Sequence, residues 1–250
     1  MRAVFGLALR QTEGLIGSII ALLGLDLTVP DHSTLSRRSK TLDMPPLRRS
    51  GTGPLHLLVD STGLKLGGAG EWLVEKHGTS RRRSWRKLHL GLDGESGEIV
   101  AIELTSKEID DAARSGALLD QITDPIASFT ADGAYDQDKV YEGVAERHPD
   151  AAVIVPPRAT AVPGPSAATA PTQRDRHIQE IVECGRMGWQ KASGYNLRAK
   201  VEAAIGRYKR VIGDALRSRT DETEATEVAI AAAALNRMLE FGRPNYVRIA

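Results

Sequence analysis

The first 50 residues follow the 3.6-residue period of helices. Between Thr12 and Gly24 the apolar positions return to one side, which predicts a helix that is capped by Thr12 and ends at Gly24. The positions expected on its buried side are Leu15, Ile16, Ile19, Ile20, Leu22 and Leu23. The chain is therefore expected to begin with a small helical region.

A second, basic helix is predicted over residues 34–41, with Asp31 or Ser33 as its cap. Two short helices of which the second is basic resemble a helix-turn-helix, so Arg37 and Arg38 are candidate DNA contacts. Ordinary helical packing explains the same pattern equally well. Prolines and glycines within residues 42–54 then indicate a linker.

After the linker, the pattern changes to the short apolar runs and two-residue period of strands. The run 55–59 ends at Asp60, and residues 84–93 and 98–105 alternate on either side of a hairpin turn at 94–97. The segments expected to follow are a helix from about Asp110 to Ile122, a strand 127–131 ending at Asp132, a helix 137–147 and a strand 151–155. The order β-β-β-α-β-α-β, followed by more helix, predicts an α/β domain with a mixed sheet covered by helices.

The length of 250 residues, 41% of them hydrophobic, allows one sizeable core and a small accessory domain. We expect a helical region at 1–50 and one α/β domain at 55–250. Within that domain, the proline-rich residues 156–173 are expected to form a flexible or extended surface segment.

Charge is distributed unevenly, although the formal net charge is only +1. Residues 72–89 contain six Lys and Arg against one Glu, and residues 174–219 contain eleven against five acidic residues. Residues 103–150 have the opposite bias, with twelve acidic residues and four basic ones. This distribution suits a protein that grips a polyanion and gathers carboxylates at one site, although a solvated surface explains any single stretch better.

Cysteine content and hydropathy indicate the cellular compartment in which the protein is expected. The single cysteine, Cys184, excludes an internal disulfide and suits a reducing environment. No signal-peptide pattern opens the chain, and the longest apolar-rich run, residues 14–25, is shorter than the about 20 residues that span a bilayer. We expect a cytoplasmic protein with no membrane partner.

Asp60 and Asp132 each follow an apolar strand and precede small residues. At the carboxyl edge of an open α/β sheet, two such acids on adjacent strands can hold a divalent metal through oxygen ligands. Loop capping is the simpler explanation for either acid alone. Two acids in similar settings, together with a third in a basic helix, favour a metal site.

That third acid is Glu202, which belongs to the spacing Y-x2-R-x3-E-x6-K formed by Tyr195, Arg198, Glu202 and Lys209. On a helix these four positions return to about one face. The positions left for apolar packing are Val201, Ala204, Ile205 and Tyr208. A lone Glu among cations suits a metal ligand whose neighbours reach phosphates, and an ion-paired surface helix is the alternative.

With these motifs the chain resembles the DDE transposases of bacterial insertion sequences, specifically the IS-five-like group with an RNase H-like catalytic domain. The resemblance covers nearly the whole chain. It rests on residues 58–65 (LVDSTGLK), 85–89 (WRKLH), 131–136 (ADGAYD) and the set Tyr195, Arg198, Glu202 and Lys209. It implies an RNase H-like mixed sheet flanked by helices, with Asp60, Asp132 and Glu202 as the catalytic, metal-binding triad.

The resemblance also implies a function. Double-stranded DNA would be cleaved at the element's ends and joined to target DNA by a homo-oligomer associated with the nucleoid. Two Mg²⁺ (or Mn²⁺) ions would bind the triad with Asp60 between them, while Tyr195, Arg198 and Lys209 would bind phosphate or steady Glu202. The side chains expected along the DNA backbone are Arg81, Arg82, Arg83, Trp85, Arg86 and Lys87.

The amino end departs from the family, because the chain opens almost directly into Phe5-Gly6-Leu7, which suggests a truncated form. Three alternatives therefore stay open: an inactive remnant that regulates its element by binding DNA, an RNase H-like nuclease without joining activity, and a non-enzymatic α/β scaffold. The sequence has no G-x-x-x-x-G-K-[ST] loop, which argues against nucleotide hydrolysis.

Overall fold

The computed structural model describes residues 1–66 and 85–242, which form two compact units. The first, which we call the sheet unit, consists of residues 47–63 and 86–207. The second, the helical unit, consists of residues 1–46 and the described parts of 64–85 and 208–250. The helical unit is therefore assembled from segments that are distant in sequence.

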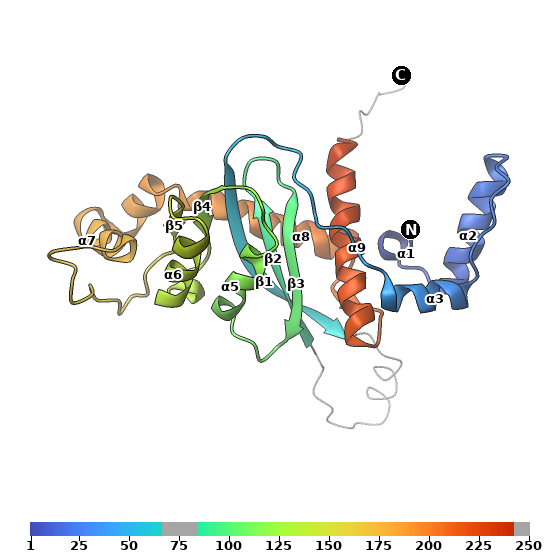
Figure 1. Ribbon diagram of the computed structural model, residues 1–250, viewed down its shortest axis with the longest axis horizontal. Coiled ribbons are helices and arrows are strands. Elements are labelled where there is room, and N and C mark those ends of the chain that lie inside the picture. The colour runs from blue at the N-terminus through green and yellow to red at the C-terminus, as the bar shows by residue number, and fades with distance from the viewer. Residues whose placement is uncertain (67–84, 243–250) are drawn as a thin grey trace, which may run out of the picture. The chain divides into compact units, whose positions relative to one another are not determined.

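The sheet unit is built on a mixed β-sheet (Figure 1). The strands are β1 (Leu55–Leu66), β2 (Trp85–Asp93), β3 (Ile99–Ser106), β4 (Ile126–Thr130) and β5 (Ala152–Ile154), in the order β3-β2-β1-β4-β5. Strands β2 and β3 are antiparallel, whereas β4 pairs in parallel with both β1 and β5. Helix α5 (Ser115–Leu119) follows β3 and α6 (Asp138–Arg147) follows β4, so the predicted element order is confirmed. A mixed sheet flanked by helices is the predicted class and is consistent with an RNase H-like fold.

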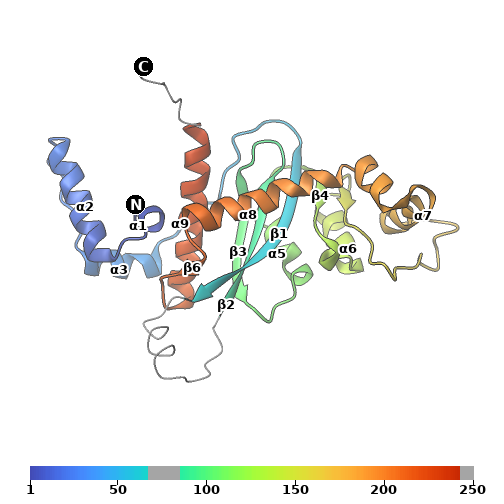
Figure 2. The ribbon, with the colours of Figure 1, turned by 180° about the vertical axis from the view of Figure 1, so that it is seen from behind.

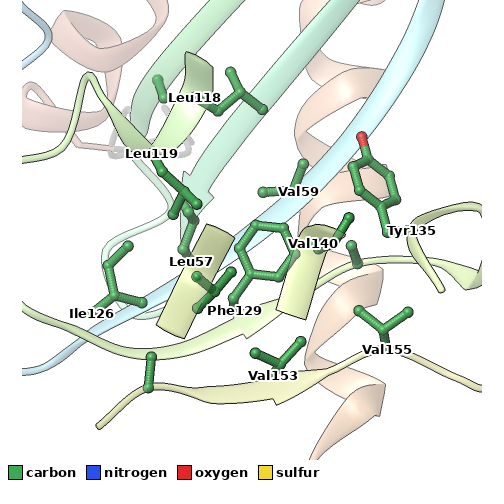
Figure 3. Packing of buried hydrophobic residues seen from close by; sticks show 14 of the residues in the cluster. Leu57, Val59, Leu118, Leu119, Ile126, Phe129, Tyr135, Val140, Val153 and Val155 are labelled. Carbon is green, nitrogen blue, oxygen red and sulfur yellow. The ribbon is translucent and has the colours of Figure 1, made fainter. Parts of the chain in front are cut away.

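The core of the sheet unit lies between the sheet and these two helices (Figure 3). Leu57 and Val59 point from β1 toward Phe129 of β4, whose ring meets the edge of Tyr135 at 6.3 Å between centroids. The helical side chains that close the core are Leu118 and Leu119 of α5 and Val140 and Val144 of α6. Leu58, between the two core residues of β1, is also fully buried, because helices cover both faces of the sheet.

Helix α8 (Ala199–Val211) crosses the opposite face of this sheet (Figure 2). Its first two turns bury Val201 and Ala204, as the apolar pattern predicted. Two elements precede it: α7 (Gln173–Ala192), which is interrupted at Gly185 where φ is 74°, and the 3-10 turn η3 (Tyr195–Arg198). The proline-rich residues 156–172 contain no helix or strand, and they are mostly exposed after Pro156 and Pro157, which are buried.

Two elements of the α/β region differ from prediction. Strand β1 does not end at Asp60 but continues to Leu66, because its last two residues pair in parallel with the distant strand β6 (Ala215–Leu216). The helix expected from Asp110 shrinks to the 3-10 turn η1 (Ala112–Arg114) and α5. Lys87 explains the late start, since its ammonium binds the carbonyl of Ile109 (2.7 Å) and the carboxylate of Asp111 (3.1 Å) and so holds this stretch in a turn.

The helical unit contains α1 (Arg2–Phe5), α2 (Leu9–Leu22), α3 (His32–Thr41) and α9 (Asp221–Glu240). The predicted cap of α3 is confirmed, because Asp31 Oδ1 accepts a hydrogen bond from the amide of Thr34 (2.8 Å). None of the helices in the two described ranges is long and apolar enough to cross a membrane.

Two predictions about α2 are wrong. Thr12 lies inside the helix instead of capping it, and its hydroxyl donates to the carbonyl of Ala8 (3.1 Å). Leu22 and Leu23, expected on the buried side, are 87% and 63% exposed. Helical periodicity showed which residues share a face, but it did not show whether another element covers that face.

Candidate active site

Asp60 points away from the main core. Because side chains alternate along a strand, Leu57 and Val59 face the core, while Leu58 and Asp60 face the side that α8 crosses. The Oδ1 atom of Asp60 accepts a hydrogen bond from the amide of Ser61 (2.8 Å), and the side chain is only 15% exposed. The strand thus presents one fixed, half-buried carboxylate.

Asp132 is brought to the same level of the sheet by strand register. Leu58 of β1 is aligned with Thr130 of the parallel strand β4, and Asp60 and Asp132 each lie two residues beyond this pair. Asp132 caps the 3-10 turn η2 (Gly133–Tyr135), and its Oδ1 accepts a hydrogen bond from the amide of Ala134 (2.9 Å). Backbone amides therefore fix one oxygen of each aspartate.

Arg198 connects these two aspartates with Glu202, which lies in the first turn of α8. Its Nη2 is 3.0 Å from Asp60 Oδ2 and 3.7 Å from Asp132 Oδ2, while its Nη1 donates to Glu202 Oε1. One guanidinium thus contacts all three carboxylates that the sequence singled out. Asp60, Asp132 and Glu202 are called the carboxylate triad below.

A chain of aromatic residues around the buried Trp189 positions the turn that contains Arg198. The indole of Trp189, which is fully buried, donates to His177 Nδ1 (2.9 Å), and His177 Nε2 donates to the carbonyl of Val153 in β5 (2.8 Å). The ring of Tyr195 packs on Trp189 with 5.4 Å between centroids. Strand β5 therefore holds the start of η3 in place through Trp189.

Burial and the neighbouring charges act on the protonation of Asp60. Burial raises the pKa of the Asp60 carboxyl, and the negative charges of Asp132 and Glu202 act in the same direction. Arg198 and the Ser61 amide lower this pKa, but they do not cancel the effect of burial. Burial alone would lower the pKa of the Arg198 guanidinium, yet the surrounding acidic groups raise it above its usual value.

The triad fits a divalent metal in donor type and in charge. Carboxylate oxygens are ligands that Mg²⁺ prefers. The Arg198 guanidinium contacts all three carboxylates, which shows that together they attract a cation. Within residues 1–66 and 85–242, no three His, Cys, Asp or Glu side chains already form a group that could hold a metal ion. In this state, Arg198 is the cation that the three carboxylates share.

The sequence assigned no role to two polar side chains that have buried, unpartnered atoms. The hydroxyl of Tyr135 has no hydrogen-bond partner, and burial raises its pKa, as do the charges of Asp111, Asp132 and Asp60. Tyr135 lies within the motif ADGAYD, which was a usable signal. Arg207 of α8 has two guanidinium nitrogens without a hydrogen-bond partner, and nothing in its sequence context distinguished it from its neighbours.

The other predicted site residues of this region lie in η3, α8 and α3, and their contacts with DNA remain predictions. Tyr195 lies with Arg198 in η3, so these two precede α8 instead of sharing one α-helix with Glu202 and Lys209, as predicted. Lys209 lies two turns after Glu202. Arg37 and Arg38 are exposed on α3.

The basic stretch before β2 is described only in part. The Lys65 ammonium lies 5.9 Å from the centroid of the Trp85 ring. Arg86 is half-buried, and Lys87 is engaged by Asp111 as described above. The three predicted DNA contacts Arg81, Arg82 and Arg83 lie outside the described residues.

Comparison with known families gives two matches, and both are to models described as a transposase DDE domain. One match covers residues 51–237, about three quarters of the chain, and includes the whole carboxylate triad. The other covers residues 1–69 and includes Asp60. With its mixed α/β sheet and its three gathered carboxylates, the chain belongs to the family of DDE transposases, enzymes that act on DNA and normally use divalent metal ions.

Proposed function

We propose that this transposase cleaves double-stranded DNA at the ends of an insertion sequence of the IS-five-like group and joins those ends to target DNA. The observation that supports the proposal is the contact of one guanidinium with Asp60, Asp132 and Glu202, which puts the three carboxylates within reach of a shared cation. Two Mg²⁺ or Mn²⁺ ions held by them would stabilise charge on the attacking and leaving oxygens of an in-line phosphoryl transfer.

The other side chains have roles in binding and orientation. Asp60, the least exposed of the three carboxylates, would be shared by the two ions, whereas Asp132 and Glu202 would each help to hold one of them. Arg198 and Lys209 bind phosphates next to the scissile bond, because guanidinium and ammonium groups match phosphate oxygens, and the Tyr195 hydroxyl can donate a hydrogen bond to the same phosphates. The basic residues of α3 and of the stretch before β2 track the DNA backbone, and a homo-oligomer brings the two ends together.

The test is a cleavage and joining assay with the full chain and labelled duplexes that contain the inverted repeats flanking the gene. We expect Mg²⁺-dependent cleavage and joining, both stopped by EDTA. Asp60→Asn, which keeps the shape of the side chain but removes its charge, should reduce both by at least about a hundredfold and leave folding and non-specific DNA binding intact. Survival of Mg²⁺-dependent cleavage in this variant would contradict the proposal.

The same assay separates the alternatives. Cleavage without joining would favour a nuclease, and binding to the repeats without cleavage would favour an inactive regulator. Scrambled duplexes of the same length are the control for recognition of the element's ends.

A further inference from the structure

The Arg198 guanidinium contacts one oxygen of each carboxylate in the triad. In Asp60 the Oδ1 atom is bound by the amide of Ser61, and Oδ2 accepts from Arg198 (3.0 Å). In Asp132 the Oδ1 atom is bound by the amide of Ala134, and Oδ2 faces Arg198 at 3.7 Å. Each aspartate therefore has one oxygen fixed by the backbone amide of a nearby residue and one oxygen that faces the guanidinium.

The third contact, from Arg198 Nη1 to Glu202, makes this arrangement a shared ion cluster instead of a simple pair. Arg198 is only 15% exposed, as is Asp60, so water screens their interaction poorly. Three carboxylates and one guanidinium leave a net charge of −2, which still attracts cations. A divalent ion at Asp60 Oδ2 would, however, compete with the guanidinium for the same lone pairs and would be repelled by its positive charge.

We infer that Arg198 is an exchangeable counterion of this site: it holds the three carboxylates together before metal binds, and it leaves them when divalent ions enter. This inference rests on the proposed function of the triad. The exchange requires only rotation of one long side chain, because the Arg198 Nε has no hydrogen-bond partner that would restrain it. Once displaced, the guanidinium is free for a DNA phosphate, so metal loading and phosphate binding assist each other.

Replacing a residue that helps to bind metal would lower the metal affinity of the site, whereas replacing Arg198 should raise it. Arg198→Gln should bind metal more tightly than the wild type, because a competing positive charge is gone. A cation within a few ångströms lowers the proton affinity of a carboxylate by about 1–3 powers of ten, and a gain of at least about tenfold in Mn²⁺ affinity is expected by the same reasoning. Without metal, the variant should unfold at a lower temperature, and Mn²⁺ should raise its Tm more than it raises that of the wild type.

The experiment is a titration of the full chain with Mn²⁺ in the absence of DNA, with free Mn²⁺ followed by electron paramagnetic resonance. Arg147→Gln is the matched control, because Arg147 pairs with Asp120 (2.7 Å) on the surface of α6, and its loss should leave the affinity unchanged. Arg198→Met gives a second variant in case Arg198→Gln does not fold. A methionine side chain is long, flexible and uncharged, so this variant also lacks the competing positive charge and should also bind Mn²⁺ more tightly than the wild type.

The outcomes separate this inference from the proposed function. Equal or weaker Mn²⁺ binding by the Arg198 variants, with wild-type binding abolished by Asp60→Asn, would overturn the exchange and keep the metal site. Mn²⁺ binding that is absent from the wild type and both variants, or unaffected by Asp60→Asn, would overturn the metal site and the exchange together.

Discussion

The hydroxyl hydrogen of Thr105 determines which ring nitrogen of neutral His89 carries a hydrogen. His89 is fully buried in β2. Thr105 Oγ1 donates its only hydrogen to the carbonyl of Ser106 (3.1 Å), so it accepts a hydrogen bond from His89 Nε2 (2.9 Å). In neutral His89, Nδ1 then has no hydrogen and lies 3.6 Å from Asp111 Oδ1. Burial lowers the pKa of His89, and the opposing effects of Asp111 and Glu103 do not cancel it.

The free energy of unfolding should therefore fall as the pH drops below about 6.5, the ordinary pKa of histidine. The unfolded chain takes up a proton at His89 in this range, while the folded chain resists it until its own lower pKa is reached. The contribution is fully present above pH 6.5 and declines by at most about 1.4 kcal/mol per pH unit as the pH falls. Urea unfolding between pH 7.5 and 5.5 measures this decline.

The control for this prediction is His89→Gln, whose amide can still donate to Thr105 but does not titrate. The difference in stability between the wild type and the variant should change with pH in favour of the variant at pH 5.5. A constant difference over the whole range would show that His89 titrates alike in the folded and unfolded chains.

Residue types could be predicted at this scale, but their partners could not. The acids at positions 60, 132 and 202 were found because each follows an apolar run or lies within a distinctive spacing. The unpartnered nitrogens of Arg207 and the hydroxyl of Tyr135 depend on which side chains surround them in three dimensions. No local pattern contains that information.

At the scale of elements, the path from β5 through α7 to η3 determines where Arg198 lies. The Trp189 indole is the centre of this path, because its N–H satisfies His177 Nδ1 and its ring supports Tyr195. Trp189→Phe keeps most of the packing but leaves His177 Nδ1 without a donor. A fully buried polar atom that loses its partner costs about 1–3 kcal/mol, and since His177 is half-buried, we expect the free energy of unfolding to fall by about 1 kcal/mol.

Denaturant unfolding of the full chain measures this effect, and the exposed Met187 of the same helix offers a control. Met187→Leu should leave the stability unchanged, because Met187 is 84% exposed. A change of less than about 0.3 kcal/mol for Trp189→Phe would mean that the hydrogen bond to His177 contributes no net stability and that packing alone fixes the turn.

Element order was more predictable than element length. The hairpin and the alternating strands and helices gave the correct succession, because the periods of two and 3.6 residues are local properties. The extension of β1 to Leu66 depends on pairing with β6, which is distant in sequence, and the late start of α5 depends on Lys87. Both exceptions arise from contacts between segments that local periodicity does not connect.

At the scale of the whole molecule, the approach of Asp60 to Asp132 could be predicted from topology, whereas the position of Glu202 on α8 could not. Acids that follow the apolar runs of neighbouring parallel strands lie at the same level, and the aligned pair Leu58 and Thr130 bears this out for Asp60 and Asp132. The composition of the helical unit could not be predicted in this way. It groups the first 46 residues with the C-terminal helix α9, and no pattern in either segment identifies the other as its partner.

The formal net charge of the whole chain is only +1, so strong binding to DNA depends on local basic stretches. Binding to duplex DNA should weaken steeply with salt, with a slope in log K against log salt of about −0.9 for each phosphate contacted. Replacing Arg81, Arg82 and Arg83 by alanine should flatten the slope equally for element ends and for scrambled DNA.

Arg37→Ala with Arg38→Ala should reduce the preference for element ends if α3 contacts bases. Fluorescence anisotropy from 50 to 300 mM salt gives both quantities, and an unchanged slope in the triple variant would show that the arginine run does not touch the backbone.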